Sequence, residues 1–137
     1  MLRHVNVRRA LLVGTAVSFA SVDLAHKSLA AADYHHARSP FITLVMGGVI
    51  AALVVLVPRI RSNVAAVGAG IACGGALGNL VSLLAWSQGV PDPLVVGTTT
   101  GVAFNLADLF ALFGDMLLLS AVAVHGLRHR HHLRQRV

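Results

Sequence analysis

Apolar residues gather in four long runs along the chain, and no regular alternation of polar and apolar residues marks out strands. Each run is close to the roughly 20 residues that a helix needs to cross about 30 Å of hydrocarbon. Because every backbone amide must be satisfied inside lipid, each run is predicted to be a transmembrane helix. The predicted helices cover residues 10–32, 41–58, 63–86 and 103–126, followed by a basic tail at 127–137.

The composition fits this pattern, with 56% hydrophobic residues, 12% charged residues and no glutamate. A soluble domain of this size needs a polar surface that so few charged residues cannot supply. A length of 137 residues is typical of one domain. We therefore predict an all-α, polytopic membrane protein in which residues 1–137 form a single domain.

Most of the eleven Lys and Arg residues lie in three clusters, at residues 1–9, 59–61 and 128–136. An even number of crossings brings all three clusters to one side, and the positive-inside rule assigns that side to the cytoplasm. Both termini are therefore predicted to be cytoplasmic. Contact with the anionic leaflet explains the net charge of +6, so membrane lipids are expected partners and nucleic acid is not.

Polar side chains inside the predicted helices are expensive in lipid and are candidates for function. Asp23 and Lys27 are four positions apart, so they share one helix face and can pair. Such a pair either fixes helix packing or supports a functional site. Asn79 carries a buried amide that needs partners, and it follows glycines at 70, 74 and 78 whose spacing predicts close helix packing.

Two further aspartates can meet at the outer end of the predicted bundle. Asp108 lies near the start of the last helix, one turn after Asn105, and Asp92 lies in the preceding loop. Two carboxylates that share a site split their pKa values, so one is protonated while the other is ionised. Such a dyad can activate a water against an amide carbonyl without a cofactor or a metal. The plainer alternative places Asp92 in a solvated turn and lets Asp108 cap the helix.

Other polar residues carry weaker signals. Asp115 follows Asp108 by seven positions, so it could extend a polar track or pair with Lys27, although a structural role is favoured. His35 and His36 are neighbours in a short loop and show no metal-ligand spacing, so no metal site is expected. Cys73 is interpreted as a small hydrophobe.

Three motifs, taken together, resemble those of lipoprotein signal peptidase (signal peptidase II). They are Gly-Asn-Leu at 78–80, Phe-Asn-Leu-Ala-Asp at 104–108, and Asp-x-x-x-Lys at 23–27. The resemblance extends from residue 23 to about residue 119, with the motifs in the family's order.

The resemblance implies that Asp92 and Asp108 form a catalytic aspartyl dyad. It also implies four residues that position the substrate or brace the site, namely Asn79, Asn105, Asp23 and Lys27. The implied substrate is a prolipoprotein whose cysteine carries diacylglycerol, cleaved just before that cysteine. The implied location is the bacterial cytoplasmic (inner) membrane, with the active site at its outer face.

The chain departs from the family pattern in three places. Ser82 and Leu83 stand where the family has Asp-Arg, Asp92 is flanked by prolines, and the outer segment between the first two helices is shortened to residues 33–40. Three functions stay open. The chain is a divergent endopeptidase, or a non-catalytic homologue that binds lipidated peptides or partner helices, or a small transporter or channel subunit. The last would use Asp23, Lys27 and Asp115 as a proton or ion path.

Overall fold

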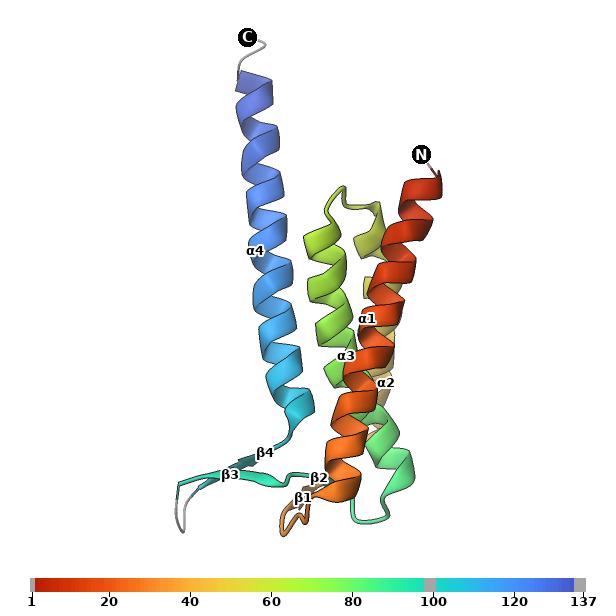
Figure 1. Ribbon diagram of the computed structural model, residues 1–137, viewed down its shortest axis with the longest axis vertical. Helices are drawn as coiled ribbons and strands as arrows, with labels where there is room; N and C mark the ends of the chain where they lie inside the picture. Colours follow the sequence, from red (N-terminus) through yellow and green to blue (C-terminus); the bar gives the residue numbers. More distant parts are fainter. Residues whose placement is uncertain (1, 98–100, 135–137) are drawn as a thin grey trace.

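The computed structural model describes residues 2–97 and 101–134, and these residues form a helical bundle with a small strand region at one end (Figure 1). Four helices in this part of the chain are long and apolar enough to cross a membrane. They are α1 (Leu2–Leu29), α2 (Pro40–Leu56), α3 (Asn63–Ala85) and α4 (Leu106–Arg134). The predicted all-α polytopic fold is confirmed.

The helix bounds differ from the predicted ranges mainly at the two basic ends. α1 begins at Leu2 and includes the basic segment, because arginine is a good helix former. α4 continues to Arg134, so much of the predicted basic tail is helical, while residues 135–137 lie outside the described part. Between α2 and α3, the short 3-10 helix η1 (Val57–Arg59) turns the chain, and its Pro58 carbonyl accepts a 2.8 Å hydrogen bond from Arg8 Nε.

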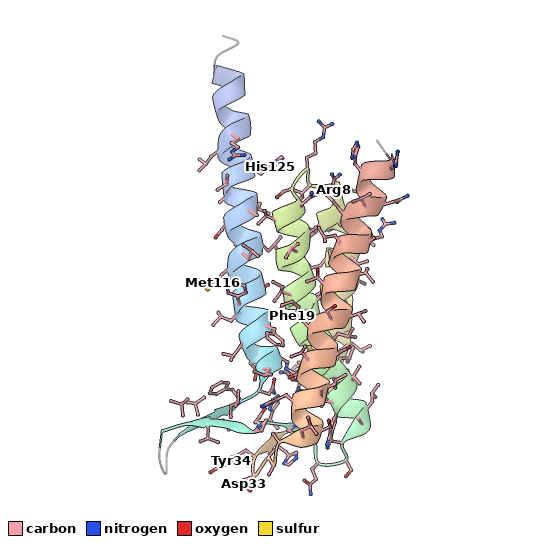
Figure 2. All side chains as sticks on the ribbon, in the orientation of Figure 1. Arg8, Phe19, Asp33, Tyr34, Met116 and His125 are labelled. Atoms are coloured by element: carbon pink, nitrogen blue, oxygen red, sulfur yellow. The ribbon has the colours of Figure 1, made fainter. Side chains whose placement is uncertain are left out.

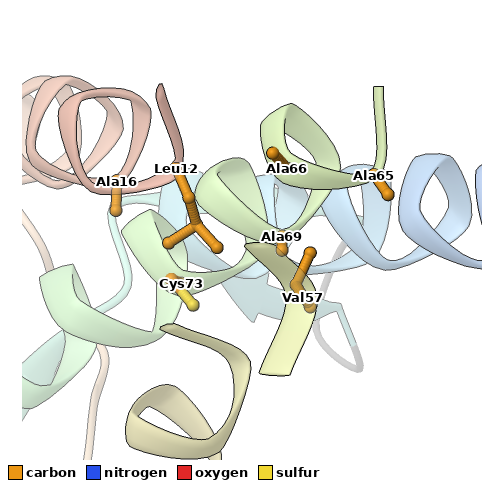
Figure 3. Packing of buried hydrophobic residues seen from close by; sticks show 7 residues of the cluster. All are labelled: Leu12, Ala16, Val57, Ala65, Ala66, Ala69 and Cys73. Carbon is orange, nitrogen blue, oxygen red and sulfur yellow. The ribbon is translucent and has the colours of Figure 1, made fainter. Parts of the chain in front are cut away.

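α3 is the central helix of the bundle, and α1 and α4 pack along it. In the most apolar stretch of α3, 67% of the residues are buried, whereas α2 has no buried residue and exposes most of its residues. Close to the η1 end, small side chains from α1, η1 and α3 form the apolar core shown in Figure 3. These residues are Leu12, Ala16, Val57, Ala65, Ala66, Ala69 and Cys73.

Glycines on α3 allow both neighbouring helices to approach closely. A Cβ added to Gly74 would lie 2.7 Å from the Cβ of Phe19 on α1, and a Cβ on Gly70 would lie 2.7 Å from the Leu12 carbonyl oxygen. On another face of α3, a Cβ on Gly75 would collide with the carbonyl oxygen of Ala107 on α4. The packing role predicted for the glycines is confirmed, since helices without large side chains at the crossing can pack tightly in lipid.

Two small antiparallel sheets lie at one end of the bundle (Figure 1). β1 (His35–His36) pairs with β2 (Val90–Pro91), and β3 (Leu94–Val96) pairs with β4 (Val102–Phe104). These strands were not predicted, because segments of two or three residues are too short to display alternating polarity.

The basic clusters and the strand region occupy opposite ends of the bundle. The first turn of α1, the turn between α2 and α3 and the last turn of α4 all lie toward the same end of the molecule, and α4 extends beyond the other helices there (Figure 1). Arg8 lies near that end, whereas Asp33 and Tyr34 lie at the other (Figure 2). This agrees with the even number of crossings inferred from charge, and the cytoplasmic location of the basic end stays a prediction.

Candidate functional site

A buried ion pair on α1 forms one side of the candidate site. Lys27 Nζ donates to Asp23 Oδ2 at 2.6 Å, and neither side chain is exposed to solvent. Lys27 Nζ also donates to Asn79 Oδ1 on α3 at 2.7 Å. Because an ammonium group can only donate, this contact fixes the Asn79 amide with its oxygen toward Lys27.

The fixed amide of Asn79 reaches the first of the two candidate catalytic carboxylates. Asn79 Nδ2 donates to Asp108 Oδ1 on α4 at 3.1 Å. A continuous path of hydrogen bonds therefore runs from Asp23 through Lys27 and Asn79 to Asp108, across three helices. The ion pair thus determines which end of the Asn79 amide faces Asp108.

The carboxylate of Asp23 also holds the first turn of α4. Its Oδ1 accepts a 2.9 Å hydrogen bond from the backbone N–H of Ala107, one of the first amides of a helix, which lack partners within the helix itself. The carboxylate fits against Gly78, where any side chain would contact it. Phe19 and Phe110 join the same two helices by an edge-to-face contact with ring centroids 4.8 Å apart.

Asn105 joins the two candidate catalytic aspartates. Its Nδ2 donates to Asp92 Oδ1 at 2.7 Å, and its backbone N–H donates to Asp108 Oδ2 at 3.1 Å. In return, Asp108 N–H donates to Asn105 Oδ1 at 3.2 Å, which is the reciprocal pattern of a helix capping box. Asn105 is thus the N-cap residue of α4, and Asp108 completes the cap from the third helical position, as the plainer alternative expected in part, but it also contacts Asn79.

Asp92 reaches Asn105 from the end of β2. Its backbone N–H donates to the Tyr34 carbonyl oxygen at 2.9 Å, which extends the pairing of β1 with β2 by one residue. Only 5% of Asp92 is exposed, so the alternative of a solvated turn is wrong. Prolines on both sides restrict the backbone around Asp92, because each fixes its own φ and limits the residue before it.

His36 on β1 is a contact that sequence reasoning missed. Its Nδ1 lies 2.5 Å from Asp92 Oδ2, although the two residues are 56 positions apart. From the sequence, His36 was considered only as a possible metal ligand. The sequence offered only a weak signal for this contact. His36 lies in the short segment between the first two helices, which is predicted to be on the same side of the membrane as Asp92.

The structure brings all six predicted site residues into one connected network. Five of them are buried and Asp108 is half-buried, so the network has its most open point at Asp108. Asp115 lies apart from this network on an exposed position of α4, while Lys27 is occupied by Asp23 and Asn79. Ser82, at a position where the family has a charged residue, is buried and donates to the Gly78 carbonyl oxygen within its own helix at 2.7 Å.

Comparisons with known proteins agree with this arrangement. No individual curated protein matches the chain. The model of the family described as signal peptidase (SPase) II matches residues 7–124, a range that contains all six residues of the network. The four apolar helices agree with a multi-pass membrane protein. The chain belongs to the signal peptidase II family, a family of aspartic-type peptidases that act on lipoprotein precursors.

Proposed function

We propose that this protein is an active aspartyl endopeptidase that cleaves the signal peptide of diacylglyceryl-modified prolipoproteins just before the lipidated cysteine. The observation that carries the proposal is the position of Asn105, which contacts the carboxylates of Asp92 and Asp108 at the same time. Through this shared partner the two carboxylates belong to one site, and in the proposed reaction they act on one water and one amide bond.

The charges around the site favour a single proton shared by the two aspartates. Asp23, Asp92 and Asp108 place three carboxylates in one network with one ammonium group, that of Lys27, and with the imidazole of His36, which adds a positive charge only when it is protonated. Like charges at close range oppose full ionisation, and retention of one proton relieves part of that repulsion. Asp23 has its own partner in Lys27, so the shared proton belongs to Asp92 and Asp108.

Hydrolysis then proceeds with both carboxyl groups in use. The ionised aspartate takes a proton from water as the water oxygen bonds to the scissile carbonyl carbon, and the protonated aspartate gives its proton to the carbonyl oxygen. In the second step the C–N bond breaks, the amine nitrogen takes the proton held by the first aspartate, and the second aspartate regains its proton from a hydroxyl of the intermediate. Neither a cofactor nor a metal takes part.

The proposed location is the bacterial cytoplasmic membrane, with the site at its outer face. The site lies at the end of the bundle that holds the two small sheets, away from the three basic clusters (Figures 1 and 2). If the basic end is cytoplasmic, as the positive-inside rule predicts, the dyad lies near the outer interface. A lipidated cysteine could then keep its acyl chains in the bilayer while the peptide bond reaches Asp108.

The test is cleavage of a synthetic lipobox peptide with a diacylglyceryl cysteine by the purified protein. We expect Asp92→Asn and Asp108→Asn each to lower kcat by about 10² to 10⁴, the usual contribution of general acid–base catalysis. Asp115→Asn is the matched control, because it makes the same change at an exposed position on the helix that carries Asp108. All variants should elute as monodisperse, helical proteins.

The other functions predict different results in the same assay. A non-catalytic homologue would bind the lipidated peptide without cleaving it, and Asp108→Asn would leave binding unchanged. A transporter or channel would lose its activity with Asp115→Asn. Absence of cleavage by the wild-type protein would therefore overturn the proposed peptidase.

A further inference from the structure

The outer segment between α1 and α2, shortened to residues 33–40, places an imidazole directly on one of the two dyad aspartates. His36 Nδ1 and Asp92 Oδ2 are 2.5 Å apart, and this contact accounts for the Asp92 oxygen that Asn105 does not bind. The Asp92 side chain is 6% exposed and that of His36 is 36% exposed. The histidine is therefore the more exposed member of the pair.

The strand register explains why these two side chains meet. His36 stands opposite Val90, so Asp92, two positions further along, is its diagonal neighbour on the same face of the pair. The close approach depends on Gly89, whose φ is +103° and where a Cβ would lie 2.6 Å from the His36 carbonyl oxygen. Since side chains alternate along a strand, His35 points to the opposite face.

The two aspartates of the dyad receive different kinds of hydrogen-bond partners. Asp108 contacts the side-chain amide of Asn79 and the backbone N–H of Asn105, both of which are neutral. Asp92 contacts one neutral amide and the imidazole of His36, a group that can carry a positive charge. Negative charge is better stabilised next to such a donor, since hydrogen bonds to charged partners are the stronger ones.

We propose that His36 is a positioning residue of the dyad that donates its Nδ1–H to Asp92. This donation keeps Asp92 ionised and in a single orientation, so Asp92 is the base that takes the proton from water. Asp108 is then the aspartate that carries the shared proton to the scissile carbonyl. A carboxylate offers about four acceptor sites, so Asp92 can still accept a water while His36 and Asn105 are bound.

This inference rests on the proposed peptidase function, and its test uses the same lipobox-peptide assay with kcat and KM measured separately. We expect His36→Ala to lower kcat by about 10- to 100-fold with KM changed by no more than about threefold, because Asp92 acts in the chemical step. His36→Asn should recover most of that loss, since its amide N–H can stand close to the position of Nδ1. His35→Asn, the matched control on the opposite face of β1, should keep wild-type kinetics.

Three results would overturn the inference. Equal losses in His36→Ala and His36→Asn would mean that the imidazole only fills space. Activity of His36→Ala at or above the wild-type level would mean that the contact holds the empty site closed. A wild-type protein that cleaves nothing would overturn both this inference and the proposed function. If the wild-type protein cleaves the peptide and His36→Ala has the same kcat, only this inference is overturned.

A second measurement needs no substrate. In protein labelled with ¹⁵N-histidine, the His36 Nδ1–H should give a low-field proton signal typical of a strong hydrogen bond to a carboxylate. The signal should disappear in Asp92→Asn and persist in Asp115→Asn. Its absence from the wild-type protein would contradict the proposed donation.

Discussion

Removal of the buried ammonium group in Lys27→Met separates the contribution of the α1 ion pair to folding from its contribution to the site. Lys27 Nζ holds Asp23 at 2.6 Å and Asn79 at 2.7 Å, and the side chains of the ion pair have no solvent exposure. Methionine is similar to the lysine stem in length, so the substitution removes the charge without opening a large cavity.

The expected loss of stability follows from the carboxylate that stays behind. Breaking a buried ion pair by removal of one partner costs about 3 to 5 kcal/mol. Asp23 keeps its 2.9 Å hydrogen bond from the Ala107 N–H, so we expect a loss near the lower end, ~3 kcal/mol. The double variant Asp23→Asn/Lys27→Met removes both charges, so no unpaired charge stays buried, and its loss should fall to about 1.5 kcal/mol, which reflects the missing hydrogen bond from Lys27 to Asn79.

Cleavage should respond differently from stability in the double variant. Without the ammonium group, the Asn79 amide is no longer fixed by a charged donor, which is worth about 1.5 to 3 kcal/mol. We therefore expect kcat to stay about 10- to 100-fold below wild type although part of the stability has recovered. Ser21→Ala, at an exposed position of the same helix, is the control.

Unfolding is followed by circular dichroism during a titration with sodium dodecyl sulfate in mixed micelles, and cleavage is followed with the lipobox peptide. A double variant that recovers both stability and kcat would show that the ion pair serves only to pack α1. A Lys27→Met protein as stable as the wild type would refute the argument from burial.

Two further predictions concern packing and orientation. Gly75→Ala should lower the free energy of unfolding by about 1 to 3 kcal/mol, because the added methyl group meets the backbone of α4. Gly48→Ala is the control. A Cβ at this position has nothing within 4 Å, so the free energy of unfolding should change by less than ~0.5 kcal/mol. Gln88→Cys should react with a membrane-impermeant thiol reagent on intact spheroplasts, and Asn6→Cys should react only after permeabilisation. The native Cys73 is 2% exposed and should be silent in this experiment, while the reverse labelling pattern would contradict the predicted orientation.

Much of the site could be predicted from sequence because its residues stand out against apolar surroundings. An aspartate and a lysine four positions apart in a membrane helix have few stable alternatives to pairing, and Asp23 and Lys27 do pair. Asn79 needs partners for the same reason, and it has them in Lys27 and Asp108. In each case the cost of an unpaired polar group in lipid makes the local sequence informative.

The contacts that escaped prediction depend on the relative placement of distant segments. His36 meets Asp92 only because β1 and β2 pair in one particular register, and a strand of two residues leaves no periodic signal in sequence. The double role of Asn105 as a helix cap and a link between two carboxylates also follows from the path of the loop before α4. Sequence pattern reports which face of an element is polar, but not which distant atoms that face will meet.

The placement of both members of the ion pair on one helix has a consequence for biosynthesis. α1 precedes the other helices in the chain, so it enters the membrane before Asn79 and the α4 amide of Ala107 are available as partners. Asp23 and Lys27 can neutralise each other as soon as that segment coils, which lowers the insertion penalty of two charged groups. The pair needs no residue of another helix to form, so α3 and α4 can pack against charges that α1 has already neutralised.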